Sequence, residues 1–436
     1  MGFDWKKTQL TDLYSITSGL SKKREEFGFG FPFLTFKEVF HNYFLPEKLE
    51  ELANTDEKEQ YKCSIARGDV FLTRTSEKFE ELGLSSVALK DYPNATFNGF
   101  TKRLRPNQTA EQELLPEFVA FYLRSVHFRN QVLSLTNMST RASLNNEMIS
   151  KLEINYPPLS DQKRIIDLLY SIHKKVEVNN NIINTIEQLA QTLFKHWFMD
   201  FEFPNENGEP YKSSGGEMVE SEFGMIPKGW GIATLGEVCD ANKDSKSNGD
   251  KWEYVNYLDT ANITRNYISK IQKLYTDKHK IPSRAKRIVK ENDIVYSTVR
   301  PNQRHYGIIK KPEENMLVST GFVVLTSKTS YSNDLVYIWL TQNEITQKLQ
   351  SIAEQSTSTY PSIKPIDILS IKLLIPLERE LVHLSSIIEK QSNLIWKNQQ
   401  QNRSLIQMRD TLLPKLLSGE IEIPDEIEVT DDVPIS

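Results

Sequence analysis

The sequence predicts an α+β fold in which two mixed α/β domains are joined by two long antiparallel coiled-coil helices, with a pseudo-two-fold internal repeat. A long helical pattern follows a globular stretch twice, once after Pro157-Pro158 and once after Pro376. In each pattern, apolar residues recur at alternating steps of four and three, the heptad spacing of a helix supercoiled against a partner. The chain, at 436 residues, is also too long for one hydrophobic core.

These patterns divide the chain into five segments. We expect a first domain over 1–157, a central long helix over 158–203, a linker and second domain over 204–375, a second long helix over 376–418 and an acidic tail over 419–436. Ser160 is expected to cap the first helix after the two prolines.

The globular stretches share short sequence patterns. Residues 67–74 resemble 291–300, because turn residues in both lead into a β-branched strand that ends near an arginine. Residues 117–123 and 334–340 are both expected to be helical. Outside such matches the two stretches differ, so the sequence predicts one domain type built twice with different surfaces.

The two heptad seams differ in polarity. Burial of a seam stabilises long helices more than intrinsic propensity does, so we expect the two helices to pack on each other; the alternative is that each helix lies on its own domain. The first seam is apolar except at Asn179, and the second also carries Gln391, Asn398, Asn402 and Arg409. The apolar seam positions are Ile165, Leu169, Ile172, Val176, Ile183, Ile186 and Leu193 in the first helix, and Leu384, Ile388, Ile395, Leu405 and Leu412 in the second.

Several other helix positions carry expectations. Asn179, Asn398 and Asn402 would set the register of the two helices, although the last two are equally compatible with a surface position. His173 and His196 fall off the seam and are expected to face solvent. The apolar side chains of Phe194, Trp197 and Phe198 would contact a partner subunit or cap the helix pair against the second domain.

Composition and motifs make an enzyme an unfavourable interpretation. The sequence has no glycine-rich phosphate loop, dinucleotide fingerprint or HExxH motif. Cys63 and Cys239 are too isolated for a metal site and are expected to be ordinary thiols in a reducing cytoplasm. No apolar run approaches the ~20 residues that span a bilayer, and the N-terminus has no signal-peptide core. We therefore expect no catalytic site, no cofactor of its own and no membrane contact.

The charge distribution is compatible with DNA, although the net charge of −5 is not typical of a DNA-binding protein. The acids from Glu420 to Asp432 lie in the tail without a base, whereas residues 278–290 contain six Lys or Arg and no acid. Smaller basic clusters occur at residues 22–24 and at Lys102, Arg103 and Arg105. A protein this weakly basic is expected to need a partner that supplies further phosphate contacts.

Four motifs resemble the specificity subunits of Type I restriction–modification systems. Residues 157–165 and 193–201 resemble the start and end of that family's central helix, 224–230 the opening of its second recognition domain, and 408–420 its C-terminal signature. The second helix departs from the pattern, because it lacks the double proline and the glutamine that Gln162 supplies in the first.

The resemblance implies two target recognition domains that each read one half of a split double-stranded DNA sequence. It implies binding to two methyltransferase (modification) subunits, which carry S-adenosylmethionine and methylate adenine, and to a restriction/translocase subunit that uses ATP. The chain itself would have neither activity. Two alternatives stay open: a coiled-coil scaffold that joins protein partners without reading DNA, and the specificity subunit of a related methylation-only or phage-defence system.

The helix pair is expected to act as a ruler. The first seam, from Ile165 to Leu193, would be roughly 42 Å long at ~1.5 Å per residue, close to the about 34–36 Å of one turn of B-DNA. Base edges are read mainly by Arg, Asn and Gln, and phosphates are bound by cations. The candidate DNA contacts are Lys22, Lys23, Arg74, Arg105 and Arg141 in the first half, and Arg300, Asn302, Gln303, Arg304, Thr359 and Tyr360 in the second.

Overall fold

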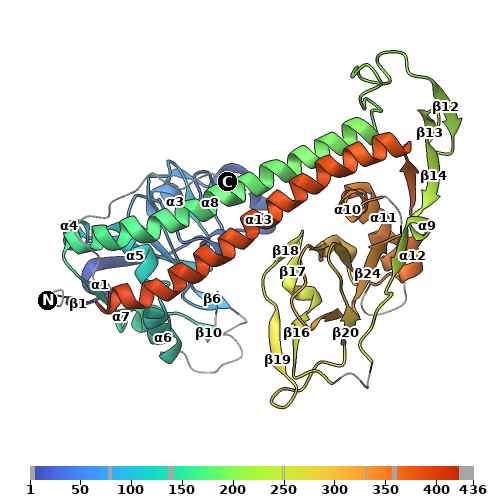
Figure 1. Ribbon diagram of the computed structural model, residues 1–436. Coiled ribbons are helices and arrows are strands. Elements are labelled where there is room, and N and C mark those ends of the chain that lie inside the picture. The colour runs from blue at the N-terminus through green and yellow to red at the C-terminus, as the bar shows by residue number, and fades with distance from the viewer. Residues whose placement is uncertain are drawn as a thin grey trace. The chain divides into compact units, whose positions relative to one another are not determined.

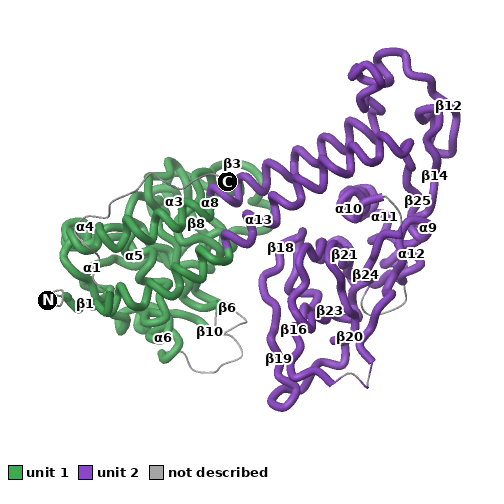
Figure 2. Tube along the Cα trace, in the orientation of Figure 1, with its two compact units in different colours: residues 1–177, 403–436 green, residues 178–402 purple. Residues whose placement is uncertain are grey.

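The fold was analysed in a computed structural model that describes residues 5–76, 81–135, 142–247, 249, 251–328, 331–355 and 361–421. The chain divides into two compact units, which Figure 2 distinguishes by colour: unit 1 is Met1–Glu177 with Arg403–Ser436, and unit 2 is Val178–Asn402. The two predicted long helices are α8 (Leu159–Phe198) and α13 (Glu378–Leu417), and each contributes residues to both units.

Unit 1 is built on a four-stranded antiparallel sheet. Its strand order is β2-β9-β5-β7, with β2 at Tyr14–Ser18, β9 at Thr101–Pro106, β5 at Val70–Thr73 and β7 at Ser85–Val87. A second sheet has the order β4-β3-β8, with β4 at Leu52–Ala53, β3 at Phe27–Leu34 and β8 at Thr96–Phe97. β1 (Lys6–Gln9) pairs with β11 (Glu153–Tyr156), and β6 (Thr75–Ser76) with β10 (Ala142–Ser143). The short helices are α1 (Leu10–Leu13), η1 (Arg24–Glu26), α2 (Phe36–His41), α3 (Glu57–Lys62), α4 (Gln108–Glu113), α5 (Pro116–Tyr122), α6 (Val126–Ser134) and α7 (Asn146–Ser150).

Unit 2 repeats this arrangement with a larger second sheet. Its first sheet has the order β15-β24-β21-β22, with β15 at Cys239–Ala241, β24 at Phe322–Ser327, β21 at Asp293–Ser297 and β22 at Tyr306–Ile309. The second has the order β19-β16-β23-β20, with β19 at Gln272–Tyr275, β16 at Tyr254–Leu258, β23 at Met316–Ser319 and β20 at Ala285–Ile288. Paired strands are β12 (Met218–Ser221) with β13 (Gly224–Pro227), β14 (Gly231–Thr234) with β25 (Lys372–Ile375), and β17 (Ile263–Thr264) with β18 (Tyr267–Ile268). The short helices are α9 (Leu235–Val238), η3 (Thr260–Asn262), η4 (Pro301–Gln303), α10 (Asn333–Leu340), α11 (Asn343–Glu354) and α12 (Pro365–Leu369).

The two units therefore share one topology, and the predicted α+β fold with an internal repeat is confirmed. In both main sheets the strand that comes last in the chain, β9 or β24, lies between the first strand and the second one. All neighbouring strands in both sheets are antiparallel. In both units a strand pair, β1-β11 or β14-β25, ends just before a long helix (Figure 1). The predicted helices at 117–123 and 334–340 are α5 and α10.

The long helices pack on each other and on the domain cores. In unit 1, Ile165 and Leu169 of α8 share a core with Leu413 and Leu416 of α13. In unit 2, residues further along α8 share a core with Leu384 and residues near the start of α13. Both arrangements that the sequence left open, helix on helix and helix on domain, are thus present.

The seam positions point inward in both helices. Every one of them is buried or half-buried, including the polar positions of the second seam. In unit 2 the fully buried Asn179 donates from Nδ2 to Gln401 Oε1 and Asn402 Oδ1, both at 2.8 Å. Asn402 is itself buried and donates to Asn180 Oδ1 at 2.8 Å. By contrast, Asn398 donates to the Leu394 carbonyl of its own helix.

Two polar side chains tie the starts of the long helices to their domains. The expectation that Ser160 caps α8 is wrong, because the helix already begins at Leu159 and Ser160 is exposed within it. Instead the buried Gln162 donates to the carbonyls of Glu113 (2.7 Å) and Pro157 (2.9 Å) and accepts from the Leu115 amide (2.9 Å). α13 lacks that glutamine. There, the buried Glu380 accepts a hydrogen bond from Trp230 Nε1 at 2.7 Å.

His173 does not face solvent as predicted, whereas His196 is exposed. The His173 ring packs among aromatic rings of unit 1, with its centroid 5.0 Å from that of Phe44 and 5.9 Å from that of Tyr43. Burial lowers the pKa of His173 to about 4. The ring is therefore neutral near pH 7 and packs as an aromatic side chain between α8 and the domain of unit 1.

The aromatic end of α8 belongs to the core of unit 2. Phe194, Trp197 and Phe198 are buried, and the Phe198 ring lies 5.4 Å from Trp230 and 5.6 Å from Trp339 between centroids. Of the two expectations for these residues, packing against the second domain is the one observed.

Candidate nucleic-acid interface

The strongest group of predicted DNA contacts lies on the loop between β21 and β22 of unit 2. Its η4 turn is flanked by Arg300 at φ 48° and Arg304 at φ 57°, both in the left-handed region that costs a non-glycine residue free energy. Pro301 is buried, whereas Asn302 and Gln303 are exposed. The amide of Asn302 donates to Gln350 Oε1 of α11 at 3.1 Å. The loop is thus fixed by its backbone and leaves amide side chains available to base edges.

A second arginine turn, which the sequence analysis did not single out, lies against this loop. Arg265 and Asn266 connect β17 to β18 with φ of 45° and 64°, the conformation of a tight hairpin turn. The Arg265 amide donates to the Arg304 carbonyl at 3.0 Å, and the Asn266 amide to the Tyr306 carbonyl at 2.8 Å. The sequence did carry a signal for this hairpin turn. An asparagine stands at the second turn position, between two short segments of β-branched or aromatic residues. The pairing with residues near 304 is a tertiary contact that no local pattern contains.

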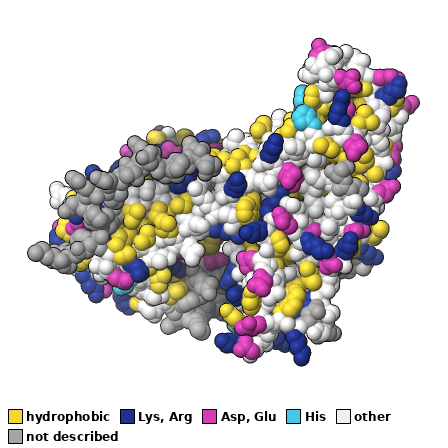
Figure 3. All heavy atoms as spheres, in the orientation of Figure 1, with side chains coloured by type: hydrophobic (Ala, Val, Ile, Leu, Met, Phe, Trp, Pro, Cys, Tyr) yellow, Lys and Arg dark blue, Asp and Glu magenta, His cyan; other side chains and the backbone are white. Residues whose placement is uncertain are grey.

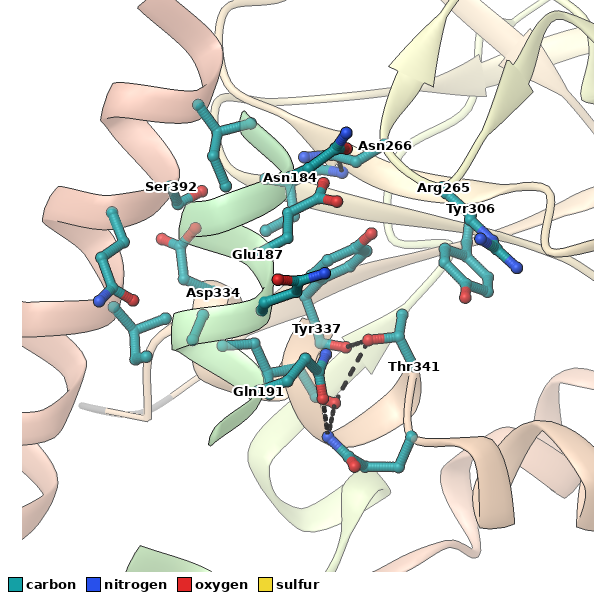
Figure 4. A pocket seen from close by; sticks show the side chains of 18 of the residues that line it. Asn184, Glu187, Gln191, Arg265, Asn266, Tyr306, Asp334, Tyr337, Thr341 and Ser392 are labelled. Carbon is teal, nitrogen blue, oxygen red and sulfur yellow. Dashed lines mark hydrogen bonds between the residues drawn. The ribbon is translucent and has the colours of Figure 1, made fainter. Parts of the chain in front are cut away.

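A cavity of about 800 Å³ adjoins the two turns within unit 2. Figure 4 shows Glu187 and Gln191 of α8 on one wall, with Tyr337 of α10, Thr341 directly after that helix and Arg265 of the hairpin turn around it. Gln342 donates to Gln191 Oε1 at 2.6 Å. Burial raises the pKa of Glu187, and the Arg265 charge opposes that rise. The described lining contains carboxylates, amides, hydroxyls, tyrosines and arginines, all of which can donate or accept hydrogen bonds.

The same cavity explains part of the polar second seam. Gln391, a seam residue of α13, lines the cavity, and its Oε1 is buried without a hydrogen-bond partner in the described part of the chain. A polar side chain suits position 391 because this seam position borders the polar cavity and not an apolar side chain of the other helix.

Lysines at the start of the basic run 278–290 and just before it lie over aromatic rings of unit 2. Lys273 Nζ lies 4.1 Å from the ring centroid of Tyr254, and Lys278 Nζ lies 5.4 Å from that of Tyr275. Lys290 forms an ion pair with Asp244 at 2.6 Å. On the face shown in Figure 3, basic side chains lie among acidic ones and do not form one continuous basic area.

The predicted basic cluster on β9 of unit 1 is not a basic surface. Lys102 and Arg103 are buried, and burial lowers the pKa of each. Arg105 places its guanidinium against the fully buried Asp69, with Nε at 2.8 Å from Oδ1 and Nη2 at 2.6 Å from Oδ2. This bidentate pair occupies the side of Arg105 that would otherwise read a guanine.

The remaining candidates of unit 1 fall into two groups. Lys22 pairs with Glu59 at 2.7 Å and with Glu26 at 3.3 Å, which favours a structural role. Lys23 is exposed, and Arg74 is half-buried with its Nη1 3.5 Å from the Gly99 carbonyl.

Arg141, Thr359 and Tyr360 lie outside the described residues. The structure thus groups Arg300, Asn302, Gln303 and Arg304 in unit 2, whereas Arg105 and Lys22 of unit 1 form ion pairs within that unit.

Other properties of the described residues bear on the class of protein. No helix among them combines the length and apolarity needed to cross a bilayer. Cys63 and Cys239 are buried and unpaired, and no group of three or more His, Cys, Asp or Glu in the described ranges is placed to hold a metal ion.

Comparison with known proteins finds similarity to one family along most of the chain. Residues 3–188 match the family model described as Type I restriction modification DNA specificity domain. The chain is similar to the Type I restriction enzyme MjaIX specificity subunit of Methanocaldococcus jannaschii, with 22% identity over 97% of this chain and 94% of that protein. It is 24% identical to the Type I restriction enzyme HindI specificity subunit of Haemophilus influenzae, over 96% of this chain and all of that protein. The crystal structure of the S subunit of a Type I restriction–modification system from M. genitalium has the same fold, with a TM-score of 0.54 and 14% identity over 98% of this chain and 97% of that one.

Proposed function

We propose that the chain is a DNA specificity subunit of a Type I restriction–modification system, as its similarity to such subunits indicates, and that it reads a bipartite, asymmetric DNA target for such a complex. As a specificity subunit it is not itself an enzyme. The observation that carries the proposal is the internal repeat, in which one strand order is built twice with different surface loops. Two recognition domains of one type but different surfaces would read two different half-sites.

The half-site of unit 2 would be read by the two arginine turns. Arg265, Arg300 and Arg304 supply guanidinium groups that can bind guanine in a bidentate manner, and the exposed Asn302 and Gln303 supply amides suited to adenine. Both turns have left-handed backbones tied to neighbouring segments, and a fixed backbone reduces the entropy lost on binding. In unit 1 the corresponding contacts would come from Lys23 and Arg74.

The long helices would set the separation between the half-sites. α8 and α13 each contain 40 residues, which corresponds to ~60 Å of helix at ~1.5 Å per residue. The buried Asn179–Asn402 pair supports this role, because a polar pair in an apolar seam favours one register over others.

The outer face of α8 offers a docking surface for the methyltransferase subunits. Val178, Ile182 and Leu189 are exposed and recur at heptad spacing, which suits a helix of a partner. We propose two methyltransferase subunits, which bind S-adenosylmethionine and methylate adenine, and a restriction subunit that uses ATP. The complex would act in the cytoplasm, and its other subunits would supply many of the contacts to the DNA phosphates.

Long-read sequencing of native DNA tests this function. Cells that carry the chain with its methyltransferase are compared with cells that lack the chain alone. The expected result is adenine methylation at one split, asymmetric motif that disappears on deletion. An unchanged methylome with an active methyltransferase would contradict the proposal and favour a coiled-coil scaffold that does not read DNA. Absence of a restriction activity beside a normal methylome would indicate a methylation-only system.

A further inference from the structure

The middle of β3 in unit 1 leaves its sheet. Phenylalanine and glycine alternate at the start of this strand, from Phe27 to Phe31. Both Phe27 and Phe31 pair with the single residue Ala53 of β4, so residues 28–30 have no partner in the ladder and form a bulge. Phe29 lies at the centre of this bulge, and 51% of its surface is exposed.

Two glycines make the bulge possible. Gly28 and Gly30 have φ of 92° and 96°, a region that other residues rarely adopt. A Cβ at Gly30 would lie 2.6 Å from the Ala53 carbonyl oxygen, whereas a Cβ at Gly28 would meet nothing within 4 Å. The chain therefore uses backbone positions that destabilise a regular strand, and Phe29 is exposed at the centre of the bulge between Phe27 (42% exposed) and Phe31 (39% exposed).

The surroundings of the bulge are charged and aromatic. Lys23 and Arg24, just before β3, are exposed, and so are the acidic residues Glu25 and Glu51. The nearby carboxylates of Glu26 and Glu59 are occupied by Lys22. Segments next to β3 carry further groups of the same kinds, because β3 pairs in parallel with β8, which leads to the exposed Phe100. Phe100 in turn accepts at its carbonyl a hydrogen bond of 2.8 Å from the amide of the candidate Arg74.

We propose that Phe29 is a wedge that inserts between base pairs of the half-site bound by unit 1. The inference rests on the proposed DNA-reading function and assigns a residue to it. A phenyl ring neither donates nor accepts a conventional hydrogen bond, so it cannot read a base edge. On DNA it acts by entering a base step, as apolar side chains of DNA-bending proteins do. The exposed Lys23 and Arg24 before the bulge can bind the phosphates that flank such a base step.

Such a wedge would assist the partner methyltransferase. An enzyme that modifies a base must take that base out of the stack, and this costs less at a step that is already partly unstacked. Opening of one step by Phe29 would lower the cost of extruding a neighbouring adenine.

The test uses the purified complex of the full chain with its methyltransferase and the substitution Phe29→Ala. 2-Aminopurine is placed in turn at each position of the first half-site, and affinity is measured on the intact site and on a site with a mismatch at the step that opens. The control is Tyr61→Ala on α3 of the same unit, where the side chain is 88% exposed and lies outside the bulge.

The wild-type complex is expected to raise 2-aminopurine fluorescence at one step, and Phe29→Ala to abolish that rise. The variant should bind the intact site about tenfold more weakly, and the mismatch should largely restore its affinity because the unstacking cost is already met. Tyr61→Ala should behave as the wild type does. Size-exclusion chromatography and thermal unfolding check that each variant folds and assembles.

Three results would overturn the wedge. If Phe29→Ala binds the intact site with unchanged affinity and fluorescence, the side chain has no role on DNA. If the variant folds but no longer retains the methyltransferase, the bulge is a protein-docking element. In both cases a wild-type complex that binds one split sequence leaves the proposed function intact. A wild-type complex without any sequence preference would instead contradict both proposals.

Discussion

Removal of one heptad from each long helix is expected to shorten the unread gap between the two half-sites. Suitable segments are residues 180–186 of α8 and 395–401 of α13, which follow and precede the Asn179–Asn402 pair and are therefore opposite each other. The deletions keep the four–three order of both seams. They also leave untouched the aromatic end of α8 and the start of α13, which form the core of unit 2.

The size of the effect follows from helix and DNA geometry. Seven residues at ~1.5 Å each shorten the pair by ~10 Å, which equals about three base pairs at ~3.4 Å. Three base pairs also rotate one half-site by about 100°, at 10–10.5 base pairs per turn, whereas a heptad changes the helix phase by only ~20°. The shortening of the helices thus limits the change in the unread gap to three base pairs. We expect the gap to shrink by one to three base pairs.

The assay is the methylome of cells that carry the shortened chain with its methyltransferase. Deletion from α8 alone is the matched control; it should abolish methylation because the two seams no longer align. Insertion of a heptad at the same two points should lengthen the gap. A double-deletion chain that methylates the original motif with the original gap would refute the ruler.

Three further predictions concern stability. Lys310→Met should destabilise unit 2 by ~3–5 kcal/mol, because it leaves the buried Asp334 carboxylate, 2.7 Å from Lys310 Nζ, without its partner. Urea unfolding should show that the double variant Lys310→Met/Asp334→Leu regains the lost stability. A double variant as unstable as Lys310→Met would contradict the view that the unpaired carboxylate causes the loss. The pKa of His173 is lowered to about 4, so folded His173 resists protonation and stability is lost as pH falls from about 6.5 towards 4, by up to ~3 kcal/mol. In thermal melts, the stability of His173→Leu should depend less on pH between about 6.5 and 4 than that of the wild type. The same pH dependence in both proteins would argue against burial of His173. Asn179→Leu should cost ~1–3 kcal/mol because it leaves the buried Asn402 Oδ1 without its donor. Asn179→Leu/Asn402→Leu should regain stability but allow several helix registers in cysteine cross-linking; a single register would contradict the role of the pair.

Local sequence patterns were sufficient for the architecture. Heptad spacing predicted α8 and α13, and the repeated strand and helix patterns predicted one domain type built twice, because both signals depend on neighbours within a few turns of chain. The polar seam position at Asn402 was equally compatible with the surface in sequence. Its partner, Asn179, is distant in the chain, and only the paired helices show that the two side chains meet.

The composition of the candidate site was less accessible to sequence. Arg105 and Arg300 were equal candidates by residue type, but Arg105 is bound to the buried Asp69 and Arg300 lies on an exposed turn. Arg265 was missed because its hydrogen bond to Arg304 depends on how two loops meet.

The sequence by itself determined the repeat and the existence of two long helices, since these rest on periodicity and on patterns contained in short segments. Only the tertiary structure decided that Arg105 is paired with the buried Asp69, that His173 is neutral and that Phe29 leaves its strand. These properties depend on burial, strand register and the partners supplied by distant segments, and a residue's identity does not specify any of the three.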